Sequence, residues 1–443
     1  MNPRVMRRAW PALLLIAAGA IGAYALYAQE GIRAVTAKAT PAPAPARGLI
    51  PASHPRIPAS HPPISKAPPG ADARVGTVTV DPTRAFTHFR VGNNSVTAIY
   101  ADGPVMWLGT SGGMVRFDTL SREFKTYDAR DGLQSNGILY LGKLKGKISV
   151  GTYGGGLSLL NQDAQEWEHY GIAEGLANVF VYDVLEASST DVWIATGAGV
   201  NRVRGGALKE RAKWDLYTVA STGGGLPHDR VQRIAEGKDG SVWFATRGGV
   251  ARFRNGKWEN WTHAKGLGAA RKGTSRGVAI KGDRTLGQAQ EKEQAHDARG
   301  AGANAALNPN HVAALAVGED GRVWAGTWGA GLARFDGKAW RNYTVAEGLA
   351  NNQISTLNFD RKGQLWIGTR DGLSVFSNGK FQVMTTAHGL LAENVYSVTT
   401  TKDGGVWVGS FGGVAHIRQP ALNNGIHLPP APIDASMTAS PSS

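Results

Sequence analysis

One pattern of apolar and polar positions recurs seven times between residues 105 and 410. Each copy is a short apolar run that ends in Thr or Ser, and most copies carry a Trp at the second position. The copies are Val105–Thr110, Lys147–Thr152, Val192–Thr196, Val242–Thr246, Val323–Thr327, Leu365–Thr369 and Val406–Ser410. They lie about 41 to 50 residues apart, with one doubled interval between the fourth and the fifth. A period of this length is typical of a unit with four short strands.

The fifth copy shows how the four strands are arranged. Val312–Val317 is an apolar inner strand, and the Asp-Gly pair that follows favours a tight hairpin turn into Val323–Thr327. A Gly-rich turn leads to a third strand, Leu332–Phe335, and an aromatic outer strand follows at Ala339–Tyr343. The pattern therefore predicts an all-β protein built from seven four-stranded units.

The two ends of the repeat region predict a closed ring. The seventh unit ends at Ile417 without a fourth strand, while Phe86–Phe89, before the first unit, matches the outer strand Trp340–Tyr343. An N-terminal strand that completes the last unit removes the open edges of the array. We therefore expect residues 75–418 to form one seven-bladed β-propeller of four-stranded blades, closed by this N-terminal outer strand.

The repeat resembles the two-component regulator propeller family. Trp366–Leu373 and Trp324–Phe335 match its Trp-Ile-Gly-Thr and Gly-Leu-x-Arg-Phe elements closely, whereas the second unit lacks the Trp. The resemblance implies a sensor-like module, because many members are the periplasmic sensor part of hybrid histidine kinases and some are thought to recognise oligosaccharides. After Ile417 the sequence contains no second apolar span, kinase or receiver. We therefore expect a stand-alone propeller without direct phosphorelay.

The N-terminal segment has the pattern of an export signal. Arg4, Arg7 and Arg8 precede an uncharged apolar stretch, Ala9–Ala28. Its length suits a membrane-spanning helix, and its small residues also suit cleavage by a signal peptidase, so residues 1–28 are either a signal anchor or a signal peptide. We expect a protein in the periplasm or on the extracellular face, anchored to the inner membrane, or secreted if the segment is cleaved.

Three further segments differ in composition from the repeats. Residues 29–74 form a linker rich in Pro and Ala, and residues 419–443 form a polar, Pro-rich tail that we expect to be disordered. Residues 268–308, rich in Gly, Ala and basic side chains, cause the doubled interval and are expected to form an inserted flexible loop. Such a loop serves as a lid or partner-binding segment, or has no function.

Composition and charge exclude several kinds of site. The 443 residues include no Cys, which excludes disulfides, Cys-ligated metals and thiol nucleophiles. The formal charge of +14 suggests nucleic-acid binding, but residues 1–74 contribute +7 of it and the insertion +3. The propeller itself is close to neutral, so no nucleic-acid partner is expected.

The turns between the second and third strands share one face and supply the candidate site. The residues directly after the closing Thr or Ser are Ser111, Tyr153, Gly197, Arg247, Trp328, Arg370 and Phe411. A bare turn prefers Gly, Asn, Asp or Ser, so the aromatic and arginine side chains indicate binding. We predict Tyr153, Arg247, Trp328, Arg370 and Phe411 as ligand-binding residues for an acidic saccharide, a peptide or an envelope protein. The alternative is that these side chains pack over neighbouring turns and plug the channel.

Catalysis has weak support in the sequence, and no catalytic residue, metal or cofactor is predicted. No zinc-protease, hydrolase or phosphate-loop motif is present. The enzyme alternative is a similarity to streptogramin lyases, which use a His base and a divalent metal; it would involve His228, His311, His388, Glu174 and Glu347. An envelope scaffold is the third possibility. The Asn residues that precede the inner strands (Asn94, Asn136, Asn178, Asn310, Asn352, Asn394) are expected to be structural.

Overall fold

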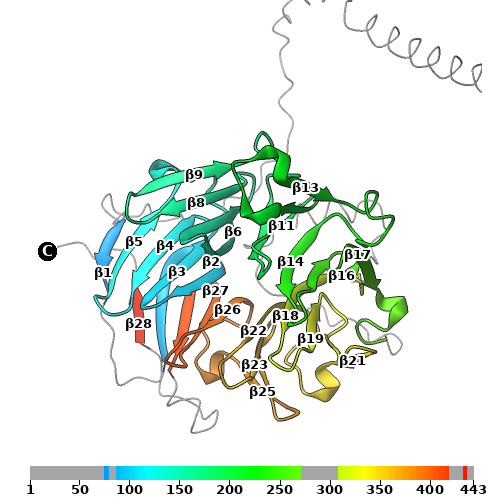
Figure 1. The fold of residues 1–443 in the computed structure, drawn as a ribbon. Helices are drawn as coiled ribbons and strands as arrows, with labels where there is room; N and C mark the ends of the chain where they lie inside the picture. Colours follow the sequence, from blue (N-terminus) through cyan, green and yellow to red (C-terminus); the bar gives the residue numbers. More distant parts are fainter. Residues whose placement is uncertain (1–73, 79–85, 271–307, 419–432, 437–443) are drawn as a thin grey trace, which may run out of the picture. The chain divides into compact units, whose positions relative to one another are not determined.

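A computed structural model describes residues 74–78, 86–270, 308–418 and 433–436 of the chain (Figure 1). The described part is all-β apart from six single-turn 3-10 helices. Their bounds are η1 Ala129–Asp131, η2 Arg204–Gly206, η3 Arg211–Lys213, η4 His263–Lys265, η5 Val345–Glu347 and η6 Thr386–His388. None of the helices in this part is long and apolar enough to cross a bilayer. Residues 1–28 and 29–74, apart from Arg74, lie outside the described residues.

Five blades are separate antiparallel sheets of four strands each. Blade 2 holds β6 (Ile138–Leu144), β7 (Lys147–Thr152), β8 (Leu157–Asn161) and β9 (Glu166–Tyr170). Blade 3 holds β10 (Val181–Glu186), β11 (Val192–Thr196), β12 (Gly199–Val203) and β13 (Trp214–Tyr217). Blade 4 holds β14 (Val231–Glu236), β15 (Val242–Thr246), β16 (Gly249–Arg254) and β17 (Lys257–Trp261). Blade 5 holds β18 (Val312–Val317), β19 (Val323–Thr327), β20 (Leu332–Phe335) and β21 (Trp340–Tyr343). Blade 6 holds β22 (Ile354–Phe359), β23 (Leu365–Thr369), β24 (Gly372–Ser377) and β25 (Lys380–Met384).

Blades 1 and 7 share the long strand β2 (Phe86–Asp102). Its second half is the inner strand of blade 1, followed by β3 (Val105–Thr110), β4 (Gly113–Asp118) and β5 (Glu123–Tyr127). Its first half pairs antiparallel with β27 (Val406–Ile417), which follows β26 (Val395–Thr400) in blade 7. The N-terminal strand thus completes the last blade, and the predicted closure is confirmed.

The closing strand is also held by buried side chains. Phe86 and Phe89 are 5% and 1% exposed, and the ring of Phe89 stacks on Trp407 with 5.0 Å between centroids. His88 Nε2 donates to the carbonyl of Gly389 at 2.9 Å, although the two residues are 301 positions apart. Hydrogen bonds and aromatic packing therefore both join the two ends of the propeller.

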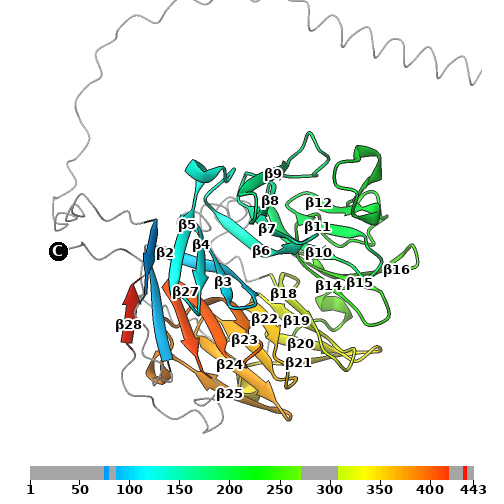
Figure 2. The same ribbon diagram turned by 60° about the vertical axis from the view of Figure 1, so that its left-hand side comes forward.

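The inner strands form a closed ring (Figures 1 and 2), and the space along the axis of such a ring is the central channel of a propeller. In chain order β2, β6, β10, β14, β18, β22 and β26 each contact the next, and β26 contacts β2. The residue at the start of each inner strand is at most 1% exposed: Val96, Ile138, Val181, Val231, Val312, Ile354 and Val395. Because side chains alternate along a strand, the residue that follows each of these points toward the channel axis.

The Thr at the end of the repeat motif stabilises the turn that follows it. In six blades its Oγ1 donates to the carbonyl of the Gly that opens the third strand or directly precedes it, at 2.7–3.0 Å. That Gly lies against the backbone carbonyl at the end of the fourth strand, where a Cβ atom would collide. The recurrent Thr and Gly are therefore explained by the turn between the second and third strands.

Gly372→Ala is expected to lower the free energy of unfolding by at least about 2 kcal/mol. Gly372 has φ +120°, and an added Cβ would lie 2.5 Å from the carbonyl oxygen of Met384. Gly363→Ala is the matched control, because Gly363 also has positive φ but has no atom within 4 Å of the added Cβ. Its expected cost is about 1 kcal/mol. Urea unfolding checks both variants; equal losses would contradict the packing role of Gly372.

Two short strands at the outer edges were not predicted. β1 (Val75–Thr77) pairs antiparallel with β5, and β28 (Ile433–Ser436) pairs parallel with the first half of β2. β28 falls within residues 419–443, for which the sequence analysis expects only a disordered tail. Both strands cover the outer edges of the two blades that share β2. Most of the predicted flexible insertion, residues 271–307, lies outside the described residues.

Candidate functional site

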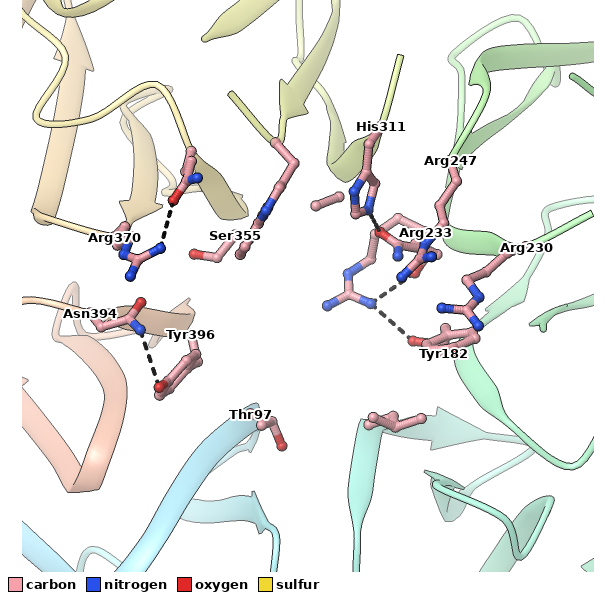
Figure 3. Close-up of a pocket in the computed structure, with 15 residues that line it drawn as sticks. Thr97, Tyr182, Arg230, Arg233, Arg247, His311, Ser355, Arg370, Asn394 and Tyr396 are labelled. Carbon is pink, nitrogen blue, oxygen red and sulfur yellow. Dashed lines mark hydrogen bonds between the residues drawn. The ribbon is translucent and has the colours of Figure 1, made fainter. Parts of the chain in front are cut away.

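A cavity of about 190 Å³ lies at the end of the channel where the inner strands begin (Figure 3). We call it the channel pocket. All seven inner strands contribute their second residue to it: Thr97, Leu139, Tyr182, Gln232, Ala313, Ser355 and Tyr396. The remaining lining residues are Arg230, Arg233, Arg247, His311, Trp328, Gln353, Arg370 and Asn394. The pocket is thus a product of ring closure, since no single blade could form it.

Four arginines line the channel pocket, and the described lining residues include no carboxylate. Arg230 directly precedes β14 and Arg233 lies within it, while Arg247 follows β15 in the same blade. Arg370 follows β23, and Figure 3 shows it on the opposite side of the pocket from the other three. The lining of the pocket is therefore strongly cationic, which favours anionic ligands.

Two of these guanidinium groups are held by neutral acceptors. Arg233 Nη1 donates to the backbone carbonyls of Tyr182 at 3.0 Å and Gln232 at 2.8 Å. Arg370 Nη1 donates to Oε1 of Gln353 at 3.4 Å. Neither contact neutralises the charge, so the positions of both side chains are defined while their positive charge is retained.

Asp183 is the acidic group that interacts with Arg233 from behind the lining. Its carboxylate accepts hydrogen bonds from the backbone N–H groups of Val184 and Ile234, at 3.0 and 2.8 Å. Burial raises the pKa of Asp183 to about 6, although the attraction of Arg233 acts in the opposite direction. The carboxylate thus links the inner strands of blades 3 and 4 and is not part of the pocket surface.

Among the lining residues that the structure describes, His311 is the one with an imidazole. Its Nε2 donates to Oε1 of Gln232 at 3.0 Å, which leaves Nδ1 without a hydrogen. Burial lowers the pKa of His311 to about 3, and the positive charges of Arg247 and Arg230 act in the same direction. A group with so low a pKa is neutral at pH 7 and is a poor general base there.

Aromatic surfaces lie beside the cationic groups. The guanidinium of Arg230 lies 6.0 Å from the centroid of Tyr182. The backbone N–H of Trp328 donates to the carbonyl of His311 at 2.8 Å, and the two rings are 6.0 Å apart. Across the pocket, the amide of Asn394 donates to the hydroxyl of Tyr396 at 3.2 Å. The pocket therefore offers both charged and stacking surfaces to a ligand.

The structure brings three of the five predicted binding residues together. Arg247, Trp328 and Arg370 line the channel pocket, whereas Tyr153 and Phe411 are not among its lining residues. Tyr153 is 41% exposed and its ring packs edge-on against Phe180, with 4.6 Å between centroids. Phe411 lies within β27, which continues through this turn without a break because it spans the second and third strands of blade 7.

The residues of the lyase alternative do not converge. Among them only His311 reaches the pocket. The others accept hydrogen bonds from nearby backbone N–H groups: His228 from Arg230, His388 from Thr385, Glu174 from Gly171 and Glu347 from Thr344. In the described part of the chain, no three His, Asp or Glu side chains are placed to hold a metal ion. His228, His388, Glu174 and Glu347 therefore act as turn and helix caps.

The Asn residues before the inner strands serve as caps, with one exception. Asn136, Asn310 and Asn352 each accept the first backbone N–H of a 3-10 helix, at 2.6–3.0 Å. Asn178 accepts the N–H of Phe180, and Asn94 donates to the carbonyl of Val91. Asn394 instead lines the channel pocket, because it stands one residue closer to its strand than Asn352 does.

Sequence reasoning missed the pocket residues that belong to the inner strands. Tyr182, Arg233 and Tyr396 occupy the strands, and Arg230 directly precedes one. The signal was present in the alternation: the second residue after each turn into an inner strand must face the axis once the ring is closed. This alternation indicates Tyr182 and Tyr396, but not Arg230, which precedes β14, or Arg233, which is its third residue and lies at an irregularity in the pairing of β14 with β15.

Two segments match a family model described as two component regulator propeller, at residues 225–248 and 348–371. These two segments have the pattern of the two-component regulator propeller repeat. The matched propeller repeats belong to blades 4 and 6, and they include all four arginines of the channel pocket. The predicted resemblance is thereby confirmed for these two repeats.

Known proteins show the same repeat and the same fold. A 65-residue stretch is 38% identical to histidine kinase P4 of Formosa agariphila, covering 13% of this chain and 5% of the kinase. The extracellular domain of a protein described as a hybrid two-component system of B. thetaiotaomicron superposes with a TM-score of 0.60 at 20% identity, covering 78% of this chain and 43% of that one. A streptogramin B lyase superposes with a TM-score of 0.52 at 13% identity, over 75% and 96% of the two chains. The chain thus covers less than half of that extracellular domain, and the matching stretch covers about a twentieth of the kinase; the structural similarities are those of fold.

Proposed function

We propose that this protein is an exported, non-catalytic propeller of the sensor type that binds an anionic ligand in the channel pocket. The observation that carries the proposal is the pocket lining, in which four arginines lie beside Trp328 and two tyrosines. Guanidinium groups pair with carboxylate or sulfate, and aromatic faces stack on ring systems. The similarity of fold to the extracellular domain of a protein described as a hybrid two-component system supports this role.

An acidic saccharide is the ligand class that this combination of groups fits best. The aromatic surfaces can pack on sugar rings while the arginines bind uronate or sulfate groups. A peptide or an envelope protein with acidic side chains is the alternative partner. We further propose that the segment 1–28 directs export and anchors the protein to the inner membrane, with the propeller in the periplasm, or is cleaved to release it.

The lyase function receives less support from the same pocket. His311 is the only imidazole among the described lining residues, and a pKa of about 3 makes that group a weak base at neutral pH. The similarity to streptogramin B lyase extends over most of both chains but is a similarity of fold. We therefore assign binding, with signal transduction or scaffolding as its consequence, in preference to catalysis.

Trp328→Ala is expected to weaken binding of trigalacturonate about tenfold or more, as loss of a central Trp commonly does. Isothermal titration calorimetry with the full chain measures this, with neutral maltotriose as the ligand control. Arg322→Ala is the control variant, since Arg322 is an exposed residue in the turn between β18 and β19, at the other end of the strands. Equal binding of the two trisaccharides, or none, would refute the anionic saccharide. Binding of an acidic peptide alone would instead identify a peptide receptor.

A further inference from the structure

The channel pocket presents its positive charges on two separate sides. Arg233 extends from β14 of blade 4, with Arg230 and Arg247 beside it, and Arg370 faces them from blade 6 (Figure 3). Arg233 and Arg370 donate to carbonyl and amide oxygens, which carry no charge, and the carboxylate of Asp183 that attracts Arg233 is not part of the pocket lining. A ligand in the pocket therefore meets a cationic surface at each of two sides.

Two hydroxyl groups of the lining, those of Thr97 and Ser355, can only accept hydrogen bonds from a ligand. The hydroxyl of Thr97 donates to the carbonyl of Ile138 at 2.6 Å, and the hydroxyl of Ser355 donates to the carbonyl of Val395 at 2.5 Å. Each hydroxyl has a single hydrogen, so toward the pocket these oxygens can only accept. An anionic group placed there would face acceptors, whereas an aliphatic or hydroxylated segment fits.

Charge balance then favours more than one anionic group in the ligand. A single carboxylate can pair with the guanidinium groups of one side only, and the cation on the other side would lose part of its hydration without gaining a partner. The cavity of about 190 Å³ is somewhat larger than cavities of about 150 Å³ that accommodate benzene, so a short carbon chain fits in it.

We propose that the channel pocket selects ligands that carry two anionic groups a fixed distance apart, one bound at Arg233 and its blade 4 neighbours and the other at Arg370. This rests on the proposed function, in which the pocket binds anions, and it adds the number and the placement of the anionic groups. Two neighbouring uronates of a saccharide end, or a small dicarboxylate, have this form.

The test is a series of α,ω-dicarboxylates of increasing length, from malonate to suberate, titrated into the full chain by calorimetry. Each dicarboxylate is compared with the monocarboxylate of the same carbon number. Two fixed anion positions predict an affinity maximum at one length, where the dicarboxylate binds at least tenfold tighter than its monocarboxylate. Arg370→Gln should reduce the dicarboxylate to the affinity of the monocarboxylate and remove the maximum. Arg322→Gln should leave the series as it is.

Arg233→Gln complements this variant, because loss of the blade 4 position should weaken monocarboxylates and dicarboxylates alike. If this variant fails to fold, the Arg370→Gln series decides alone. Binding of monocarboxylates as tightly as dicarboxylates, or affinity that changes steadily with length, would overturn the two-anion inference and leave the anion-binding proposal in place. Failure of every anion to bind, trigalacturonate included, would overturn both.

Discussion

A chain that begins at Asn94 is expected to lose the folded, monomeric propeller. This truncation removes the half of β2 that forms the outer strand of blade 7, and with it the buried rings of Phe86 and Phe89. Loss of two buried Phe side chains costs about 6 to 10 kcal/mol, which is comparable with the whole stability of a typical domain. The second half of β27 would also be left as an open strand edge.

Thermal unfolding and size-exclusion chromatography check this expectation. The control is a chain that begins at Arg74, which keeps β1 and β2 and should remain a monomer of nearly unchanged melting temperature. Phe89→Ala in the full chain separates packing from strand pairing, since it removes the contact with Trp407 while the backbone pairing is retained. A monomeric Asn94 chain with the stability of the full chain would show that the closing strand is dispensable.

The His311 side chain is expected to make the propeller less stable in acid. Its pKa is about 3 in the folded protein against an ordinary value of 6.5, so the unfolded chain binds the proton more tightly. The stability that the neutral imidazole contributes is present above pH 6.5 and is lost as the pH falls toward 3. At 1.36 kcal/mol for each pH unit, this loss is about 3 kcal/mol between pH 6.5 and pH 4.

Other groups contribute to the same pH range, so the prediction concerns a difference between variants. His416, whose pKa burial lowers to about 4, acts in the same direction as His311. Asp183, whose pKa burial raises to about 6, acts in the opposite direction, because its protonated form is favoured by folding and this contribution is lost as the pH rises through 6. Comparison of the wild type with one variant removes both contributions.

Urea unfolding of wild type and His311→Gln at pH 6.5 and pH 4 measures that difference. The stability advantage of the wild type should shrink by about 3 kcal/mol on acidification. Val312→Ala, at the neighbouring fully buried position, is the control. It removes packing but no titrating group, so its loss of unfolding free energy relative to the wild type should be the same at both pH values. If the difference in unfolding free energy between wild type and His311→Gln did not change with pH, the imidazole would have the same pKa in the folded and unfolded chains.

The fold could be predicted from the sequence because its unit repeats. Six of the seven repeats contain a Thr that bonds the backbone of the following turn and a Gly that lies against the fourth strand, so the same structural requirement recurs in the sequence at a regular interval. The closing strand is recognisable because Phe86–Phe89 has the aromatic pattern of the outer strand Trp340–Tyr343. Each of these two segments pairs with the third strand of its blade. β1 and β28 have no counterpart in the repeat, and nothing in their composition marked them as edge strands.

The site was predicted only in part because it depends on which side chains point toward the axis of the ring. Turn residues such as Arg247, Trp328 and Arg370 could be assigned to one face from the repeat alone. Whether a turn side chain reaches the axis depends on its neighbours, and Tyr153 packs on Phe180 instead. Tyr182 and Tyr396 follow from the alternation of side chains once the ring is known to be closed. Arg233 does not, because it is the third residue of β14 and reaches the pocket where the pairing of β14 with β15 is irregular, between Val231 and Arg233.

The shared blade also determines the order in which the chain can fold. The His88 and Gly389 groups that meet in blade 7 are separated by 301 residues, and closing a flexible loop of that length would cost about 5 kcal/mol in chain entropy if the chain between them were still unfolded. Blades 1 to 6 can assemble from local contacts as the chain emerges. Blade 7 cannot form until the last strands have been synthesised, because it also needs the first half of β2. Until then both ends of the array expose unpaired edges, so the interval before ring closure is when the nascent protein is most prone to aggregation and proteolysis.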